Sequence, residues 1–403
     1  MLSRRDDAES PVLTLVDVRE SALADLREYI AVQTRKRAAK TPQLLQTFYP
    51  KATADEVADA FVNDTLAVIR MTTAIEDVGG SRLVLEAVPE IEPLKIETLR
   101  RIDAAVTGQA WLLSNTSSIP IGHLDATADL GGRIVGLHFY NPPAIQKLVE
   151  LIPASSTQPQ LVAIASDLIQ RLGKTEVRSA DVAGFIGNGF FIRDTLHTLA
   201  MTERLATDRP LHEAVCAMDR VTRDGLLRPM GTLQLIDYVG LDVFHAITRT
   251  MAAHIDGELF EAPLIQALLN DGHKGGQYPD GTQKDGFFSY DGRQAVAVFD
   301  RDTGGYEALT SHIDDELDLN SHITWKALLQ DPCAADRLDE HFAMLAKSES
   351  AGARLAREQL AASRQIGERL IATGVAANAA DLEAVLQLGF HHAYGAINEF
   401  GVS

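Results

Sequence analysis

The sequence GRIVGLHFYNPPAIQKLVELIP, residues 132–153, contains two short apolar strands that each carry one ionisable side chain near its end. An Asn-Pro-Pro sequence stops the first strand just after His138, and the second strand, residues 147–153, carries Glu150. Adjacent parallel strands end at the same edge of a sheet, where ligands bind in open α/β folds. We therefore expect the imidazole of His138 and the carboxylate of Glu150 to meet at such an edge.

The sequence around this segment alternates between strand and helix patterns, which predicts parallel βαβ units and an open α/β sheet. After Gly184 the pattern becomes helical, except for a Gly-rich and polar loop or linker at 271–292. We expect strands at 11–18, 68–74, 81–90, 110–121, 132–143, 147–153 and after Gly173, and helices at 20–40, 54–70, 92–106, 160–172, 184–206, 211–222, 232–250, 258–270 and within 303–403.

A weak internal repeat connects the two helical parts. The sequence ERLAT at 203–207 is echoed by ERLIAT at 368–373, and EAV at 213–215 is echoed at 383–385. Such short matches also arise by chance. The domain boundaries that we expect are 1–180, 181–292 and 293–403, with the last domain a degenerate copy of the second.

Composition excludes several functions. The 403 residues include 37 Lys and Arg against 56 Asp and Glu, a net charge of −19 that disfavours nucleic acid and anionic membranes as partners. No apolar run is long enough to span a membrane, and the N-terminal residues lack a secretory pattern, so we expect a cytoplasmic protein. Two cysteines are too few for disulfide bonds to stabilise a chain of this length. His212 and Cys216 lie four residues apart, but two ligands do not make a metal site, so no metal is expected.

Six motifs then occur in one order and register: SNTSS (114–118), HFYNP (138–142), LVEL (148–151), GFIGN (184–188), PMGTLQLIDYVGLD (229–242) and KDGFFSYD (284–291). Together they resemble the L-3-hydroxyacyl-CoA dehydrogenase family from about residue 12 to 291. The resemblance implies a Rossmann-like α/β nucleotide-binding domain, followed by two all-α domains in which 295–403 is the second copy. It also implies NAD as cofactor and an acyl-CoA as substrate.

The same resemblance assigns roles to residues. His138 is implied to be the general base, Glu150 its partner, and Ser117 and Asn188 the groups that bind the substrate oxygens. Histidine suits this role because its unperturbed pKa of about 6.5 is close to neutrality. The cofactor contacts implied by resemblance are Asp17, Glu90, Lys95 and Asn115, with Asp17 favouring NAD over NADP and Lys95 facing a phosphate.

Each of these residues also has a structural interpretation. A single histidine after a strand is usually a satisfied structural residue, Glu150 could be a solvated strand end, and Asn188 and Ser117 could stabilise a helix start and a turn. The shared register of the motifs favours the functional interpretation. Gly184 and Gly187 are expected to allow close packing at a helix start.

One element of the family pattern is missing. The G-x-G-x-x-G turn that lets a backbone approach the pyrophosphate should lie about 20 residues before Asp17, yet the first 78 residues contain no glycine. We expect the chain to lack the first strand and this loop, with residues 1–10 forming the end of the first helix and a turn. The alternative is a natural remodelling that gave up the cofactor.

Two other functions therefore stay open. One is a catalytically silent acyl-CoA-binding or structural paralogue, and the other is a relative that oxidises a small hydroxy acid without CoA. A tandem helical copy could occupy the place of a partner subunit, so we expect a monomer with two helical domains packed together, the alternative being a homodimer.

Overall fold

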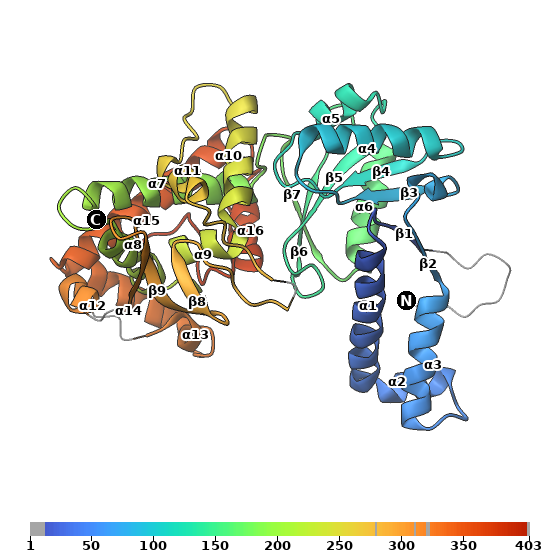
Figure 1. The fold of residues 1–403 in the computed structure, drawn as a ribbon, viewed down its shortest axis with the longest axis horizontal. Helices are drawn as coiled ribbons and strands as arrows, with labels where there is room; N and C mark the ends of the chain where they lie inside the picture. The colour runs from blue at the N-terminus through green and yellow to red at the C-terminus, as the bar shows by residue number, and fades with distance from the viewer. Residues whose placement is uncertain (1–12, 279, 310–311, 320–322, 401–403) are drawn as a thin grey trace. The chain divides into compact units, whose positions relative to one another are not determined.

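A computed structural model describes residues 13–278, 280–309, 312–319 and 323–400 (Figure 1). The helix end and turn expected at residues 1–10 lie outside these ranges. The chain divides into two compact units: the first holds the residues up to 84 together with 97–111, and the second holds 85–96 and the residues from 112 onward.

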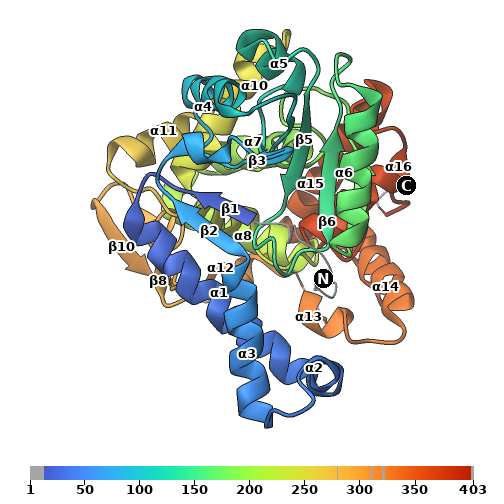
Figure 2. The same cartoon turned by 90° about the vertical axis from the view of Figure 1, so that its right-hand side faces the viewer.

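The first unit contains a short parallel sheet and a helical hairpin. Strand β1 (Leu13–Val16) pairs with β2 (Ile69–Thr72), and the long helix α1 (Glu20–Lys40) lies against α3 (Ala54–Ala67) with α2 (Pro42–Phe48) between them in sequence (Figure 2). Thr53 and Glu56 form a capping box that fixes where α3 begins. A short 3₁₀ helix, η1 (Ile75–Val78), follows β2.

The main sheet has the strand order β3-β4-β5-β6-β7. Its strands are β3 (Leu83–Glu86), β4 (Trp111–Ser114), β5 (Ile134–Phe139), β6 (Leu148–Ile152) and β7 (Thr175–Arg178), and the helices between them are α4 (Glu92–Ala105), α5 (Ile121–Ala128) and α6 (Pro159–Arg171). Helix α6 covers β5, β6 and β7 with an apolar stripe of Leu161, Ala165 and Ile169 (Figure 2). All of β6 is buried, so the sheet is covered on both faces at this point.

The direction of β6 relative to β5 differs from the prediction. Strands β4 and β5 are parallel, as are β6 and β7, but β5 and β6 are antiparallel. The physical reason is the connection, because residues 140–147 are too few for the crossover of about a dozen residues that parallel strands need. The prediction of one open sheet also differs from the structure. Among the described strands, β1 and β2 pair only with each other and form a parallel sheet separate from the five-stranded one.

The remainder of the second unit is mostly helical, as predicted, with one small antiparallel sheet. Its elements are α7 (Gly187–Leu205), α8 (Leu211–Arg220), the π-helical turn η2 (Val221–Gly225), α9 (Thr232–Val239), α10 (Leu241–His254), α11 (Pro263–Asn270), β8 (Phe288–Asp291), β9 (Gln294–Asp300), β10 (Gly305–Ala308), α12 (His312–Leu317), α13 (Trp325–Leu328), α14 (Ala334–Lys347), α15 (Ala351–Ala372) and α16 (Ala379–Gly389). The sheet β10-β9-β8 corrects two expectations: the helical domains are not entirely α, and the segment 271–292 does not consist only of loop.

The C-terminal residues pack on two surfaces of the second unit. Helix α15 lies along α7 in a core that also contains α8 to α11. Helix α16 lies against β6 and β7, where Leu382, Val385 and Leu386 pack with Leu148 and Val177. The expected packing of the two helical parts against each other is present, and the contact of α16 with the sheet adds to it. No helix among the described residues is both long and apolar enough to cross a membrane.

Candidate active site

His138 and Glu150 form a cross-strand pair in the main sheet. They lie directly opposite each other in the antiparallel register of β5 and β6, and Nδ1 of His138 is 2.9 Å from Oε1 of Glu150. A carboxylate can only accept, so Nδ1 carries the hydrogen, and in the neutral ring this leaves a lone pair on Nε2. The Glu150 side chain is fully buried and that of His138 is 10% exposed. The sequence predicted this contact, but from parallel strand ends, which is the wrong geometry.

Four donors hold the carboxylate of Glu150. Besides His138, the hydroxyl of Tyr140 donates to Oε1 at 2.7 Å, and the backbone N–H groups of Ile186 and Gly187 donate to Oε2 at 3.0 and 3.3 Å. These amides lie at the start of α7, where the helix dipole also favours a negative charge. These four hydrogen bonds fix the carboxylate of Glu150 in position beside the imidazole of His138.

Tyr140 is a site residue that the sequence reasoning missed. Its burial and the neighbouring charge of Glu150 hold the pKa of its hydroxyl well above the usual 10, so it donates and does not ionise. The available signal was the two-residue period of a strand, because residues 138 and 140 point to the same face.

Ser117 and Asn188 meet beside this pair. The side-chain amide of Asn188 donates to the backbone carbonyl of Ser117 at 2.7 Å, and Asn188 directly follows Gly187. Asn115 joins the neighbouring strands, because its side-chain oxygen accepts from the N–H of Phe139 at 2.9 Å. Thus Ser117, Asn188 and the histidine–glutamate pair belong to one cluster.

Glu90 organises the turn that holds Ser117. Its Oε1 accepts from the hydroxyl of Thr116, from the N–H groups of Ser117 and Ser118, and from the hydroxyl of Ser118, at 2.7 to 3.0 Å. Burial alone would raise the pKa of Glu90, but the charge of Lys95 and these hydrogen bonds outweigh it, so its pKa lies below the usual value. The lowered pKa favours the carboxylate form of Glu90, whose hydrogen bonds hold the SNTSS turn.

Lys95 is buried and paired with two carboxylates, and the expectation that it faces a phosphate stays a prediction. Its side chain is 1% exposed, and its ammonium lies 2.9 Å from Glu86 and 3.3 Å from Glu90. It also donates to the carbonyl of Val88 at 3.0 Å. The ammonium thus has two hydrogen-bond acceptors and an ion pair with Glu90, the residue that holds the turn.

Asp17 belongs to the first compact unit, where it directly follows β1. Its Oδ1 accepts from the N–H of Arg19 at 2.8 Å, and the carboxylate stays partly exposed. The predicted position of Asp17 after a strand is confirmed, and its contact with a ribose stays a prediction.

The groups of the cluster suit one end of NAD better than the other. Glu90, Asn115 and the Ser/Thr turn offer the hydroxyl, amide and carboxylate groups that bind a ribose and a carboxamide. For the pyrophosphate, the described residues before Gly79 offer no glycine turn. The fit thus rests on the end of the cofactor where the chemistry takes place.

A buried cross-strand pair of a histidine and a carboxylate in an α/β sheet, followed by a helical region, is typical of two-domain dinucleotide-dependent dehydrogenases. Comparison with known proteins makes the family specific. Residues 9–182 match the 3-hydroxyacyl-CoA dehydrogenase NAD binding domain, and residues 184–285 match the C-terminal domain of the same enzymes. The chain belongs to the 3-hydroxyacyl-CoA dehydrogenase family, which consists of NAD-dependent oxidoreductases.

Individual relatives agree with this assignment. A 3-hydroxybutyryl-CoA dehydrogenase of Mycobacterium tuberculosis is 32% identical over 237 residues, which cover 58% of this chain and 80% of that protein. The crystal structure of M. tuberculosis FadB2 is 30% identical, with a TM-score of 0.53 over 65% of this chain and 86% of that one. The structure of an Escherichia coli 3-hydroxybutyryl-CoA dehydrogenase, 23% identical, shares the fold with a TM-score of 0.65 over 95% of this chain and 84% of that one.

Proposed function

We propose that this protein interconverts L-3-hydroxyacyl-CoA and 3-oxoacyl-CoA with NAD as the electron acceptor, using His138 as the general base. The observation that carries the proposal is the buried pair of His138 and Glu150 in a chain of this family. The Mycobacterium tuberculosis relative that is 32% identical is a 3-hydroxybutyryl-CoA dehydrogenase, which supports the same substrate class here.

Proton transfer follows from the tautomer of His138. With its Nδ1–H bound to Glu150, Nε2 accepts the proton of the substrate's 3-hydroxyl while C3 loses a hydride. NAD, when bound, supplies the acceptor for that hydride. The imidazolium that forms is stabilised by the adjacent carboxylate, as in other histidine–carboxylate pairs. In the reverse direction His138 returns the proton to the 3-oxo group.

The neighbouring residues position the reactants. We assign Ser117 and Asn188 to the 3-oxygen and the thioester carbonyl of the substrate, where a hydroxyl and an amide can donate hydrogen bonds. Glu90 and Asn115 are assigned to the nicotinamide end of the cofactor, Lys95 to the support of Glu90, and Asp17 to the adenosine ribose.

The test is NADH formation from 3-hydroxybutyryl-CoA by the full chain. We expect turnover by the wild type and a loss of about 10²- to 10⁴-fold in kcat for His138→Ala, since a positioned general base contributes about that much. His245→Ala is the matched control, because His245 lies on α10 outside the cluster. Undiminished turnover by His138→Ala would contradict the mechanism. No turnover with intact CoA binding would favour the silent paralogue, and turnover only of small hydroxy acids would favour the other alternative.

We also propose that 181–292 and 293–403 are two copies of one helical domain and that the chain is a monomer. The support comes from the chain itself. The repeated sequences at 203–207 and 368–373 lie at the C-terminal ends of α7 and α15, and these two helices pack together. We expect gel filtration to give a mass near 43.8 kDa. A mass of twice that value would contradict the monomer.

A further inference from the structure

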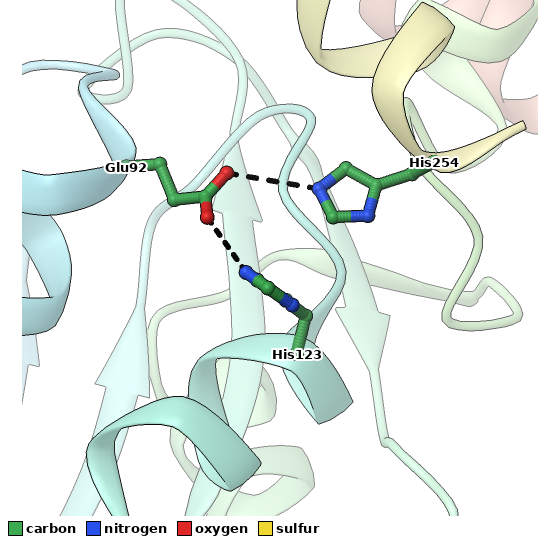
Figure 3. Close-up of side chains that lie close together, drawn as sticks. All are labelled: Glu92, His123 and His254. Atoms are coloured by element: carbon green, nitrogen blue, oxygen red, sulfur yellow. Dashed lines mark hydrogen bonds and ion pairs between the residues drawn. The ribbon is translucent and has the colours of Figure 1, made fainter.

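We propose that Glu92, His123 and His254 bind one Zn²⁺ ion. The three residues come from different helices: Glu92 begins α4, His123 lies in the first turn of α5 and His254 ends α10. Figure 3 shows the carboxylate of Glu92 between the two imidazole rings, with one oxygen directed at each. These residues lie far apart in the sequence and share no motif, and no metal site was expected from the sequence.

The separations of the donor atoms suit a metal ion of this size. Nε2 of His123 lies 2.7 Å from Oε1 of Glu92, and Nε2 of His254 lies 3.7 Å from Oε2. One ligand atom from each residue lies within 4.8 Å of the other two. Zinc–ligand bonds of about 2.0–2.1 Å in a tetrahedral site place neighbouring donor atoms about 3.3 Å apart, between the two distances found here.

His254 gives a second, independent indication of a ligand. Its Nε2 is buried and has no hydrogen-bond partner among the described residues, and its side chain is only 18% exposed. A buried polar atom without a partner is costly and calls for an explanation such as a bound ion. The two imidazole rings meet edge to face with centroids 4.8 Å apart, which directs both rings at the same carboxylate.

The donor set selects the kind of metal. Two imidazoles and one carboxylate are ligands of zinc and similar transition metals, whereas Mg²⁺ and Ca²⁺ prefer oxygen donors alone. The side chains of Glu92 and His123 are 37% and 35% exposed, so solvent can reach the ion and water can complete its coordination. The site would tie α4 and α5, beside the main sheet, to the end of α10 in the helical region.

Zinc binding is tested with ZnCl₂ on the full-length protein, after removal of any affinity tag and treatment with EDTA. We expect calorimetry to give one Zn²⁺ per chain, and the thermal midpoint to rise with zinc as for any ligand of the folded state. Glu92→Gln, His123→Ala and His254→Ala should each weaken binding by about tenfold or more. MgCl₂ should give neither signal.

The matched controls are Glu97→Gln on α4 and His245→Ala on α10, which should bind zinc like the wild type. Glu92→Gln keeps the shape of the side chain, so its result stands even if a histidine variant folds poorly. The proposal is overturned if the wild type binds no zinc, or if the three variants bind it with unchanged affinity and stoichiometry.

Discussion

At the scale of single residues, the candidate site depends on Glu150 more than on any other side chain. Its two oxygens accept four hydrogen bonds, from His138, Tyr140, Ile186 and Gly187. A glutamine at this position has only one acceptor oxygen, and its NH₂ group would face donors. Glu150 therefore sets the tautomer of His138 and also binds the backbone at the start of α7.

We predict that Glu150→Gln lowers kcat by about 10²- to 10⁴-fold, because the imidazole loses both its orientation and the charge that stabilises the imidazolium. Steady-state NADH formation measures the effect. Glu176→Gln on the adjacent strand β7 is the control, and it should keep wild-type kcat. Activity of Glu150→Gln within a factor of three of wild type would show that Glu150 does not serve the base.

Sequence motifs were sufficient to pair His138 with Glu150 and to place Ser117 near Asn188. They could not show that Lys95 is buried, because this depends on Glu86, a strand residue that only the fold brings to the ammonium. The cluster of Glu92, His123 and His254 escaped for the same reason, as its members are far apart in sequence and share no periodic pattern.

At the scale of elements, the start of α7 is the part on which the site is built. Gly187, the first residue of this helix, packs so closely that a Cβ would lie 1.9 Å from the hydroxyl of Tyr140 and 2.9 Å from Oε1 of Glu150. The sequence-based expectation of close packing at this glycine is confirmed. Any side chain here would push the helix away from the carboxylate that it binds.

We predict that Gly187→Ala lowers both stability, by about 1–3 kcal/mol as in other overpacked cores, and kcat, by tenfold or more. Urea unfolding and NADH formation measure the two effects. Gly80→Ala is the control, because a Cβ at Gly80 meets nothing within 4 Å. If Gly187→Ala keeps full activity, the packing of α7 does not set the geometry of the base.

Elements with clear periodicity were predicted closely, such as α4, α6 and the strands of the main sheet. The direction of β6 was predicted wrongly because the apolar pattern of a strand does not show whether it runs parallel to its neighbour. The short connection from β5 to β6 was the available signal for an antiparallel pair. The sheet β8–β10 was missed because its glycine-rich surroundings are typical of loops. Its position depends on a buried carboxylate in α9, which is 50 residues away from the segment it holds.

At the scale of the whole molecule, the helical region is held together by contacts between distant motifs. Asp237 in LQLIDYVGLD is fully buried and accepts hydrogen bonds from the N–H groups of Phe287 and Phe288 and from the hydroxyl of Tyr290, at 2.7 to 3.0 Å. These donors belong to KDGFFSYD, so the two motifs bind each other through one side chain. Gly286 is required beside it, because a Cβ there would lie 2.1 Å from the Asp237 carboxylate.

This arrangement makes the stability of the whole fold depend on pH. Burial raises the pKa of Asp237 to about 8, although the hydrogen bonds from Phe287, Phe288 and Tyr290 oppose the shift. In the unfolded chain an aspartate ionises above about pH 3.9. Between these two pH values unfolding releases a proton, so the free energy of unfolding falls as the pH rises, by at most about 1.4 kcal/mol per pH unit.

We predict that the free energy of unfolding of the wild type exceeds that of Asp237→Asn at pH 5, and that this difference shrinks toward pH 8. The amide does not titrate, so the variant lacks this part of the pH dependence. Urea unfolding at several pH values measures the difference, and Asp271→Asn, an exposed position at the end of α11, should follow the wild type throughout. A difference that stays constant or widens as the pH rises would mean that Asp237 remains ionised in the folded protein and joins the two motifs as a carboxylate over this whole range.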